Sequence, residues 1–111
     1  MQVRELSYED INEMQQIAKT IRQQIGMVTL MACGARNWRF LENGKRGISF
    51  QVGAGSRRHF INIGLEPDDT YTIVSYKLKR ITNERIQLAA HTDIYCDQLT
   101  DLIYRMTHHY E

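Results

Sequence analysis

The sequence predicts an α+β fold, with an N-terminal helix, an antiparallel meander of about five strands, and a C-terminal helix packed on one face of the sheet. Two observations predict it. Near both ends of the chain, apolar residues recur at steps of three and four, the period of an amphipathic helix. Between them, short segments alternate apolar and polar residues and are separated by turn-forming residues. The length of 111 residues fits one α+β domain covering 1–111.

The first helix is expected from Tyr8 to Ile25. Ser7 and Asp10 are spaced as in a capping box, with Asp in place of the usual Glu. Gly26 is suited to end the helix. A single apolar stripe runs along it: Ile11, Met14, Ile17, Ala18, Ile21 and Ile25. Because only one stripe is apolar, we expect this helix to pack on the apolar face of the sheet.

The apolar segment 27–35 has no clear period, so its pattern is compatible with a short helix or a buried strand. Its Ala, Met and Leu residues favour helix, which makes a helical turn or a buried connector the preferred interpretation. The segment contains Cys33, and Cys96 lies in the C-terminal region. Two cysteines make no disulfide framework, so we expect both to be small buried hydrophobic residues.

Turn residues divide the central region into strands. Asn43-Gly44 suits the positive φ angles of a two-residue hairpin, and Pro67 followed by Asp68 suits a tight turn. Consecutive strands joined by such turns usually pair as neighbours, which predicts a meander. The expected strands cover residues 36–41, 48–52, 61–65, 70–79 and 86–90.

The closing helix is expected from Ile94 to His108, with Thr92 or Asp93 as its N-cap. Its apolar stripe contains Tyr95, Leu99, Leu102, Ile103 and Met106. His108 and His109 fall at the far end, where positive charge suits the helix dipole. Adjacent histidines lack the i, i+4 spacing of a helical metal site, so no metal site is expected.

The net charge of +1 is unevenly distributed along the chain. Residues 1–33 carry three basic and four acidic side chains, residues 34–87 carry ten and five, and residues 88–111 carry one and four. A basic sheet is therefore flanked by acidic helices. The basic side chains either solvate the strand faces and protect their edges, or form a site for a polyanion.

No motif of this chain predicts catalysis, so we expect a protein that is not an enzyme and has no cofactor. The acidic residues lie mostly in turns and near helix starts, whereas acid–base chemistry requires paired groups in a pocket. The glycine-rich segment 53–56 lacks the Lys-Ser/Thr ending and following helix of a phosphate-binding loop. A hairpin connection is the preferred interpretation of that segment.

Basic and aromatic residues interleave along the predicted sheet, an arrangement that can hold single-stranded nucleic acid. Phe60 should be exposed because it points away from Ile61, and exposure is expected next at Tyr71. The candidate nucleic-acid-binding residues are Lys45, Arg46, Arg57, Arg58, Phe60, Tyr71 and Lys77.

Three segments resemble landmarks of small uncharacterised proteins encoded by bacteriophages and conjugative mobile elements. They are residues 29–35 (TLMACGA), 65–71 (LEPDDTY) and 94–99 (IYCDQL). The resemblance covers the chain from residue 27 to residue 107. It implies an accessory role in mobile-element biology, in a bacterial cytoplasm or phage-infected cell, and it transfers no catalytic residue.

The alternative function is a protein-binding inhibitor that blocks a host defence effector sterically, in the manner of anti-CRISPR proteins. With either function, two copies could dimerise through the sheet edge or its remaining apolar surface. No apolar run approaches the roughly 20 residues of a membrane span, and the first residues are polar, so the cytoplasm is the expected location.

Overall fold

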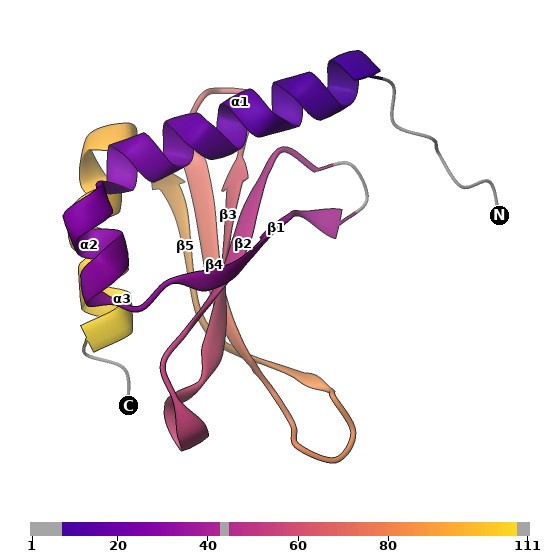
Figure 1. Ribbon diagram of the computed structural model, residues 1–111, viewed down its shortest axis with the longest axis vertical. Coiled ribbons are helices and arrows are strands. Elements are labelled where there is room, and N and C mark those ends of the chain that lie inside the picture. The colour runs from indigo at the N-terminus through magenta and orange to yellow at the C-terminus, as the bar shows by residue number, and fades with distance from the viewer. Residues whose placement is uncertain (1–7, 43–44, 109–111) are drawn as a thin grey trace, which may run out of the picture.

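The computed structural model of the protein describes residues 8–42 and 45–108. Its elements follow one another as α1 (Tyr8–Ile25), α2 (Met27–Ala32), β1 (Arg36–Phe40), β2 (Gly47–Val52), β3 (His59–Leu65), β4 (Tyr71–Leu78), β5 (Arg85–Ile94) and α3 (Leu99–His108), with short 3-10 helices η2 (Gly55–Arg57) and η3 (Cys96–Gln98). All neighbouring strands are antiparallel, in the order β1-β2-β3-β4-β5 (Figure 1). The predicted α+β meander is confirmed.

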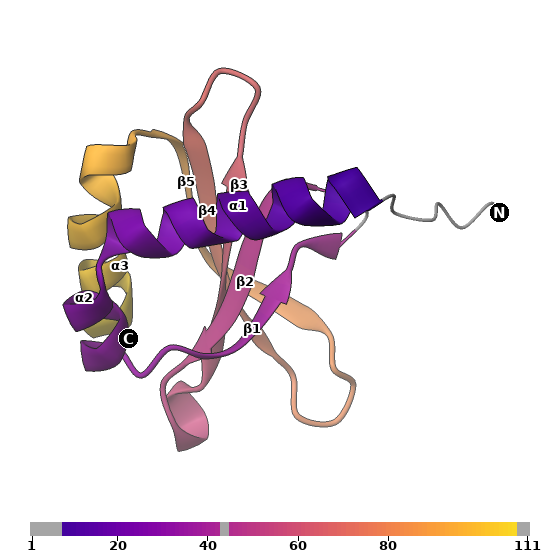
Figure 2. The same ribbon diagram turned by 45° about the horizontal axis from the view of Figure 1, so that its top comes forward.

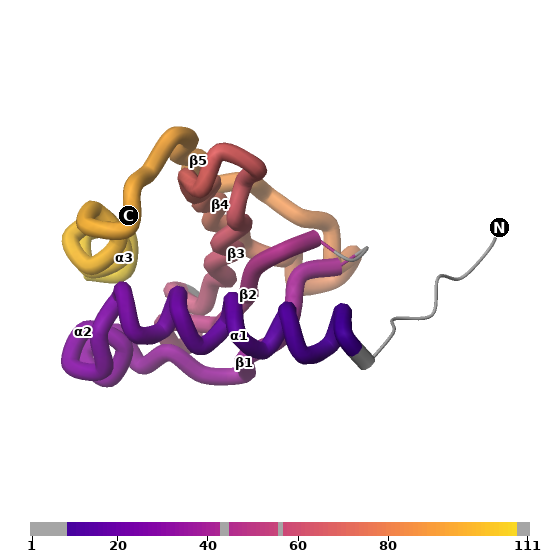
Figure 3. The backbone as a smooth tube through the Cα atoms, turned by 90° about the horizontal axis from the view of Figure 1, so that it is seen from above, coloured from indigo at the N-terminus to yellow at the C-terminus, as the bar shows by residue number. Residues whose placement is uncertain are grey.

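The three helices cover one face of this sheet. Helix α1 crosses the strands, and α2 and α3 lie side by side near the C-terminal end of α1 (Figure 2). Seen from above, α1 and α3 border two sides of the space in which the core lies (Figure 3). None of the helices among the described residues is long and apolar enough to cross a membrane.

The core forms between the apolar face of the strands and the apolar stripes of α1 and α3. Alternate residues of three strands face the helices and are buried: Ile48, Phe50, Val52, Ile61, Ile63 and Ile73. Ile21 and Ile25 of α1 and Leu99 and Ile103 of α3 are buried against them, as the stripes predicted. The ring of Trp38 lies 4.6 Å from that of Phe50 and has the guanidinium of Arg22 over it. The amphipathic patterns therefore place the core correctly.

The segment after α1 is helical but not buried. Gly26 has φ +94°, and the short helix α2 that follows exposes Met27, Val28 and Met31 by 76%, 82% and 74%. The predicted helical turn is confirmed, whereas the alternative of a buried connector is wrong, because a helix of six residues turns only one side, with Leu30, towards the core. Cys33 is half-buried and Cys96 is exposed, so neither is the buried residue expected. The predicted turn at residues 43–44 lies outside the described residues.

The C-terminal helix begins later than predicted. Ile94 pairs with Tyr71 and ends β5, and η3 separates it from α3. The N-cap before η3 is Tyr95, whose backbone N–H donates to the Gln98 side chain at 2.9 Å, whereas Asp93 adopts φ +56° within the strand. Strand pairing has overridden the capping preference of Asp93. Tyr95 is exposed rather than part of the apolar stripe.

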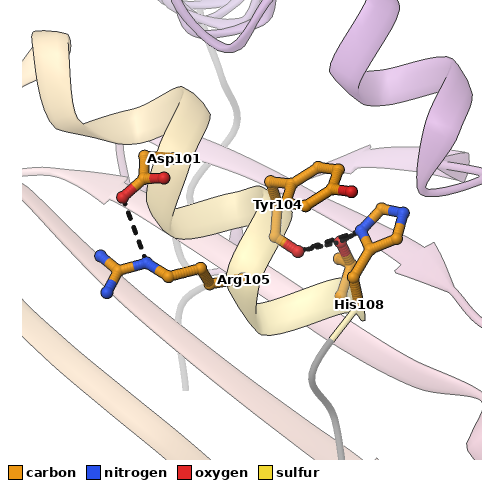
Figure 4. A network of polar contacts seen from close by, with 5 residues as sticks. Asp101, Tyr104, Arg105 and His108 are labelled. Atoms are coloured by element: carbon orange, nitrogen blue, oxygen red, sulfur yellow. Dashed lines mark hydrogen bonds and ion pairs between the residues drawn. The ribbon is translucent and has the colours of Figure 1, made fainter.

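The C-terminal turn of α3 contains a local polar network (Figure 4). The His108 ring stacks on Tyr104 at 4.0 Å, and its Nδ1 donates to the Tyr104 carbonyl oxygen at 3.0 Å. Arg105 forms an ion pair with Asp101 at 3.2 Å, one turn away. His108 lies at the end of α3, as predicted, and its side chain bonds to a carbonyl oxygen of the last turn, whereas His109 lies outside the described residues.

Tyr71, which the sequence placed on the surface, belongs to the core. It is 3% exposed, and its hydroxyl donates to Gln24 Oε1 at 2.6 Å. Tyr71 lies on the same side of β4 as Ile73, because side chains alternate along a strand. Burial raises the pKa of the Tyr71 hydroxyl, which keeps it a donor. Tyr71 is therefore excluded from any surface site.

We expect Tyr71→Phe to lower the free energy of unfolding by about 1 kcal/mol, because it removes one hydrogen bond and leaves Gln24 Oε1 without its donor. Urea denaturation measures the change. Nucleic-acid binding should not change. A variant of unaltered stability that bound nucleic acid less well would return Tyr71 to the binding site.

Candidate nucleic-acid interface on the helix-free face

The face of the sheet opposite the helices carries two rows of side chains that run across β2, β3 and β4. The pairing register places Ser49 beside Asn62 and Asn62 beside Val74. The neighbouring row joins Gln51 to Phe60 and Phe60 to Tyr76. Since the residues between them face the core, these side chains point away from the helices.

A hollow of about 350 Å³ lies over the first row. Its lining includes Ser49, Asn62, Gly64, Thr72 and Val74 from the central strands, and Arg39, Phe40, Leu41, Glu42, Lys45, Glu66, Tyr76 and Arg85 from strand ends and connections. This volume is within the range of small-ligand sites. Aromatic, amide, hydroxyl and charged groups all reach it, so it can take a polar, planar ligand.

The hollow exists because the two ends of the sheet approach each other. The Arg85 guanidinium at the start of β5 donates to Glu42 Oε1, just after β1, at 3.2 Å. This bridge joins the first and last strands on the helix-free side. The sheet is therefore curved, with the helix-free face on the inside of the curve.

A second, shallower hollow continues the first one. It is lined by Asn37, Trp38, Arg39, Gln51 and Phe60. Arg39 lines both hollows, so they are neighbours, and we call the two together the sheet groove.

In the sheet groove, an arginine guanidinium lies over each of two aromatic rings. The rings of Phe60 and Tyr76 stack with centroids 5.2 Å apart and an interplanar angle of 14°. The guanidinium carbon of Arg85 lies 4.5 Å from the Tyr76 centroid, and that of Arg39 lies 6.0 Å from the Phe60 centroid. Such contacts orient a guanidinium over a ring, and Arg85 is also paired with Glu42. Because Tyr76 is 6% exposed and Phe60 is half-buried, the groove presents these arginines beside the ring of Phe60.

The side-chain oxygen of Asn62 is buried beneath this face and makes no hydrogen bond with the described residues. Thr72, by contrast, donates to Glu66 Oε1 at 2.9 Å. A buried polar atom without a partner is costly, so such a position is expected to bond to an ordered water or to a ligand. Among the described residues, no three His, Cys, Asp or Glu side chains lie together as metal ligands would.

Comparison with protein-family models, with curated proteins and with solved structures finds no match to this chain. What the sheet groove binds is therefore inferred from its own geometry and chemistry.

The structure brings only two of the seven predicted residues into the sheet groove, namely Lys45 and Phe60. Arg57 and Arg58 are exposed at η2, immediately before the strand that carries Phe60. They do not line the groove.

The remaining predicted residues lie on the other side of the sheet. Arg46 is exposed but forms an ion pair with Glu13 of α1 at 3.1 Å, which directs it towards the helices. Lys77 is half-buried on the side of β4 that carries Tyr71. Neither can act together with Phe60.

The predicted site did not include Tyr76, Arg39 or Arg85, although Arg39 and Tyr76 belong to the basic and aromatic residues that interleave along the predicted sheet. Alternation could have found Tyr76, because it has the same parity in β4 as Thr72 and Val74, which point away from the core. No local pattern could have linked Arg39 to Arg85, because they come from strands at opposite edges of the sheet.

Proposed function

We propose that the sheet groove binds single-stranded nucleic acid. The observation that carries the proposal is the row in which Arg39 and Arg85 flank the stacked rings of Phe60 and Tyr76 beside the hollow. Proteins that bind single strands without strong sequence preference combine cations for the phosphates with flat side chains on which bases stack. Lys45, on the rim of the hollow, adds a third cation.

Each part of the groove has a distinct role in this proposal. Arg39, Lys45 and Arg85 contact phosphates, and the half-buried ring of Phe60 supports one base. A second base enters the hollow, where the side-chain amide of Asn62 forms a hydrogen bond with the edge of that base. Arg57 and Arg58 contact further phosphates of the same strand, beyond the base that stacks on Phe60.

The test is fluorescence anisotropy of labelled single- and double-stranded DNA and RNA oligomers at low and at physiological salt. We expect the single strands to bind more tightly than the duplexes, because stacking on the ring of Phe60 requires an unpaired base. The logarithm of the affinity should fall with the logarithm of the salt concentration with a slope between about −2 and about −3.5, since each of the three groove contacts, and of the two that Arg57 and Arg58 add, contributes about −0.7. Absence of binding at low salt would overturn the proposal.

A second candidate function is steric blocking of a host protein, and α2 is the observation that favours it. Its side chains Met27, Val28 and Met31 project into solvent, and adaptable methionines are common on protein-binding surfaces. Binding through this surface would change little with salt, unlike binding to phosphates. The resemblance to proteins of mobile elements stays a prediction with either function.

A further inference from the structure

We propose that two copies of this chain pair through their β5 strands, antiparallel about a two-fold axis at Ala89. Strand β5 ends the sheet, so its outer edge pairs with no other strand in the described part of the chain. It lies at the border of the molecule away from α1 and β1 (Figure 3). It is ten residues long and mostly exposed, which gives a long row of backbone donors and acceptors.

The composition of β5 does not protect this edge. Its only Lys, Arg, Asp or Glu residues are Arg85 and Asp93, near its two ends, and it contains no proline. Ile86 and Leu88 are 41% and 36% exposed. Natural edge strands usually carry lysine, proline, an inward charge or a β-bulge to prevent pairing with another chain, and of these devices β5 has only the bulges.

The register of β5 suits pairing with itself. Ala89 lies four residues from Arg85 and four from Asp93, so an axis at Ala89 sets Arg85 opposite Asp93 of the second copy. Each arm of the strand contains one register shift relative to β4, and Asp93 adopts φ +56° at the second, so pairing about this axis has to accommodate one bulge in each arm. In a two-fold interface each such contact occurs twice.

The charges around β5 favour the same antiparallel orientation. Near Arg85, residues 77–85 contain four basic side chains and one acidic side chain. Near Asp93, residues 66–72 and 91–98 contain five acidic side chains and no Lys or Arg. Asp93 lines a shallow hollow with Glu66 and Asp68. Antiparallel pairing brings the basic end of each strand to the acidic end of the other, whereas parallel pairing would bring like charges together.

The test is the oligomeric state of the purified protein at up to about 100 µM, where even a micromolar dimer is populated. Light scattering after size exclusion should give the mass of a dimer. Leu88→Lys with Ala90→Lys should give a monomer, because these positions oppose each other across the axis and bring like charges together. The matched control, Val28→Lys with Met31→Lys on α2, should remain a dimer. A monomeric wild-type protein, or a dimer lost only in the α2 variant, would overturn the proposal.

Crosslinking decides the outcome if the lysine variant fails to fold. Ala89→Cys, in a Cys96→Ser background with oxidised glutathione, should give disulfide-linked dimers, since residues opposed across a strand pair lie within disulfide range. Val28→Cys in the same background should stay monomeric on a denaturing gel. Crosslinking no faster at Ala89 than at Val28 would overturn the proposed axis. Neither experiment contains nucleic acid, so the result is independent of what the sheet groove binds.

Discussion

Replacing Phe50 by alanine is expected to lower the free energy of unfolding by about 3–5 kcal/mol. The ring is fully buried, packs 4.6 Å from Trp38, and stands opposite Ile61 of β3. Its removal leaves a cavity in the core that neighbouring side chains fill only in part. Domains of this size have a total stability of about 5–15 kcal/mol, so the variant should lose about a fifth of it or more. Urea denaturation, with Tm as a second readout, measures the loss.

The matched control is Phe60→Ala, the same change on the next strand but on the helix-free face. Phe60 is half-buried and stacks on Tyr76, so we expect a loss of about 1 kcal/mol. The difference between the two variants tests which face contains the core. Equal losses would contradict the assignment of the core to the helix-covered face.

Removing both groove arginines, with Arg39→Ala and Arg85→Ala together, is expected to weaken single-strand binding about 100-fold at low salt. This is a tenfold loss, about 1.4 kcal/mol of binding free energy, for each arginine. These two cations flank the aromatic rings, and Arg85 also offsets the negative charge of Glu42. The slope of log affinity against log salt should become shallower by about 1.4, because two phosphate contacts are lost. The anisotropy titration at several salt concentrations measures both quantities.

The control for this variant is Arg57→Ala with Arg58→Ala, which removes the same charge outside the sheet groove. We expect the loss of single-strand affinity to be several times smaller, because these exposed side chains contact only the end of the bound strand. A larger loss from Arg57 and Arg58 than from Arg39 and Arg85 would move the site to the connection between β2 and β3. Thermal unfolding of both variants shows whether either change acts through the fold.

Local patterns in the sequence determined the order and type of the elements. The alternation of Ile48, Phe50 and Val52 with polar residues has the period of a strand with one buried face, and it predicts the core side of β2. The stripe that ends in Ile21 and Ile25 has the helical period, and Gly26 follows α1 as predicted. Both signals depend on residues a few positions apart, so they can be read without knowledge of the fold.

The tertiary structure alone decided where those elements end and what they bring together. Asp93 would cap a helix in isolation, but pairing between Ile94 and Tyr71 extends β5 past it. The sheet groove depends on the curvature of the sheet, which brings Arg85 to Glu42 and sets the arginines on the rings of Phe60 and Tyr76. These contacts join strands far apart in the chain, and no local spacing encodes them. Short-range periodicity therefore determined the fold, whereas the candidate site depends on the long-range packing that curves the sheet.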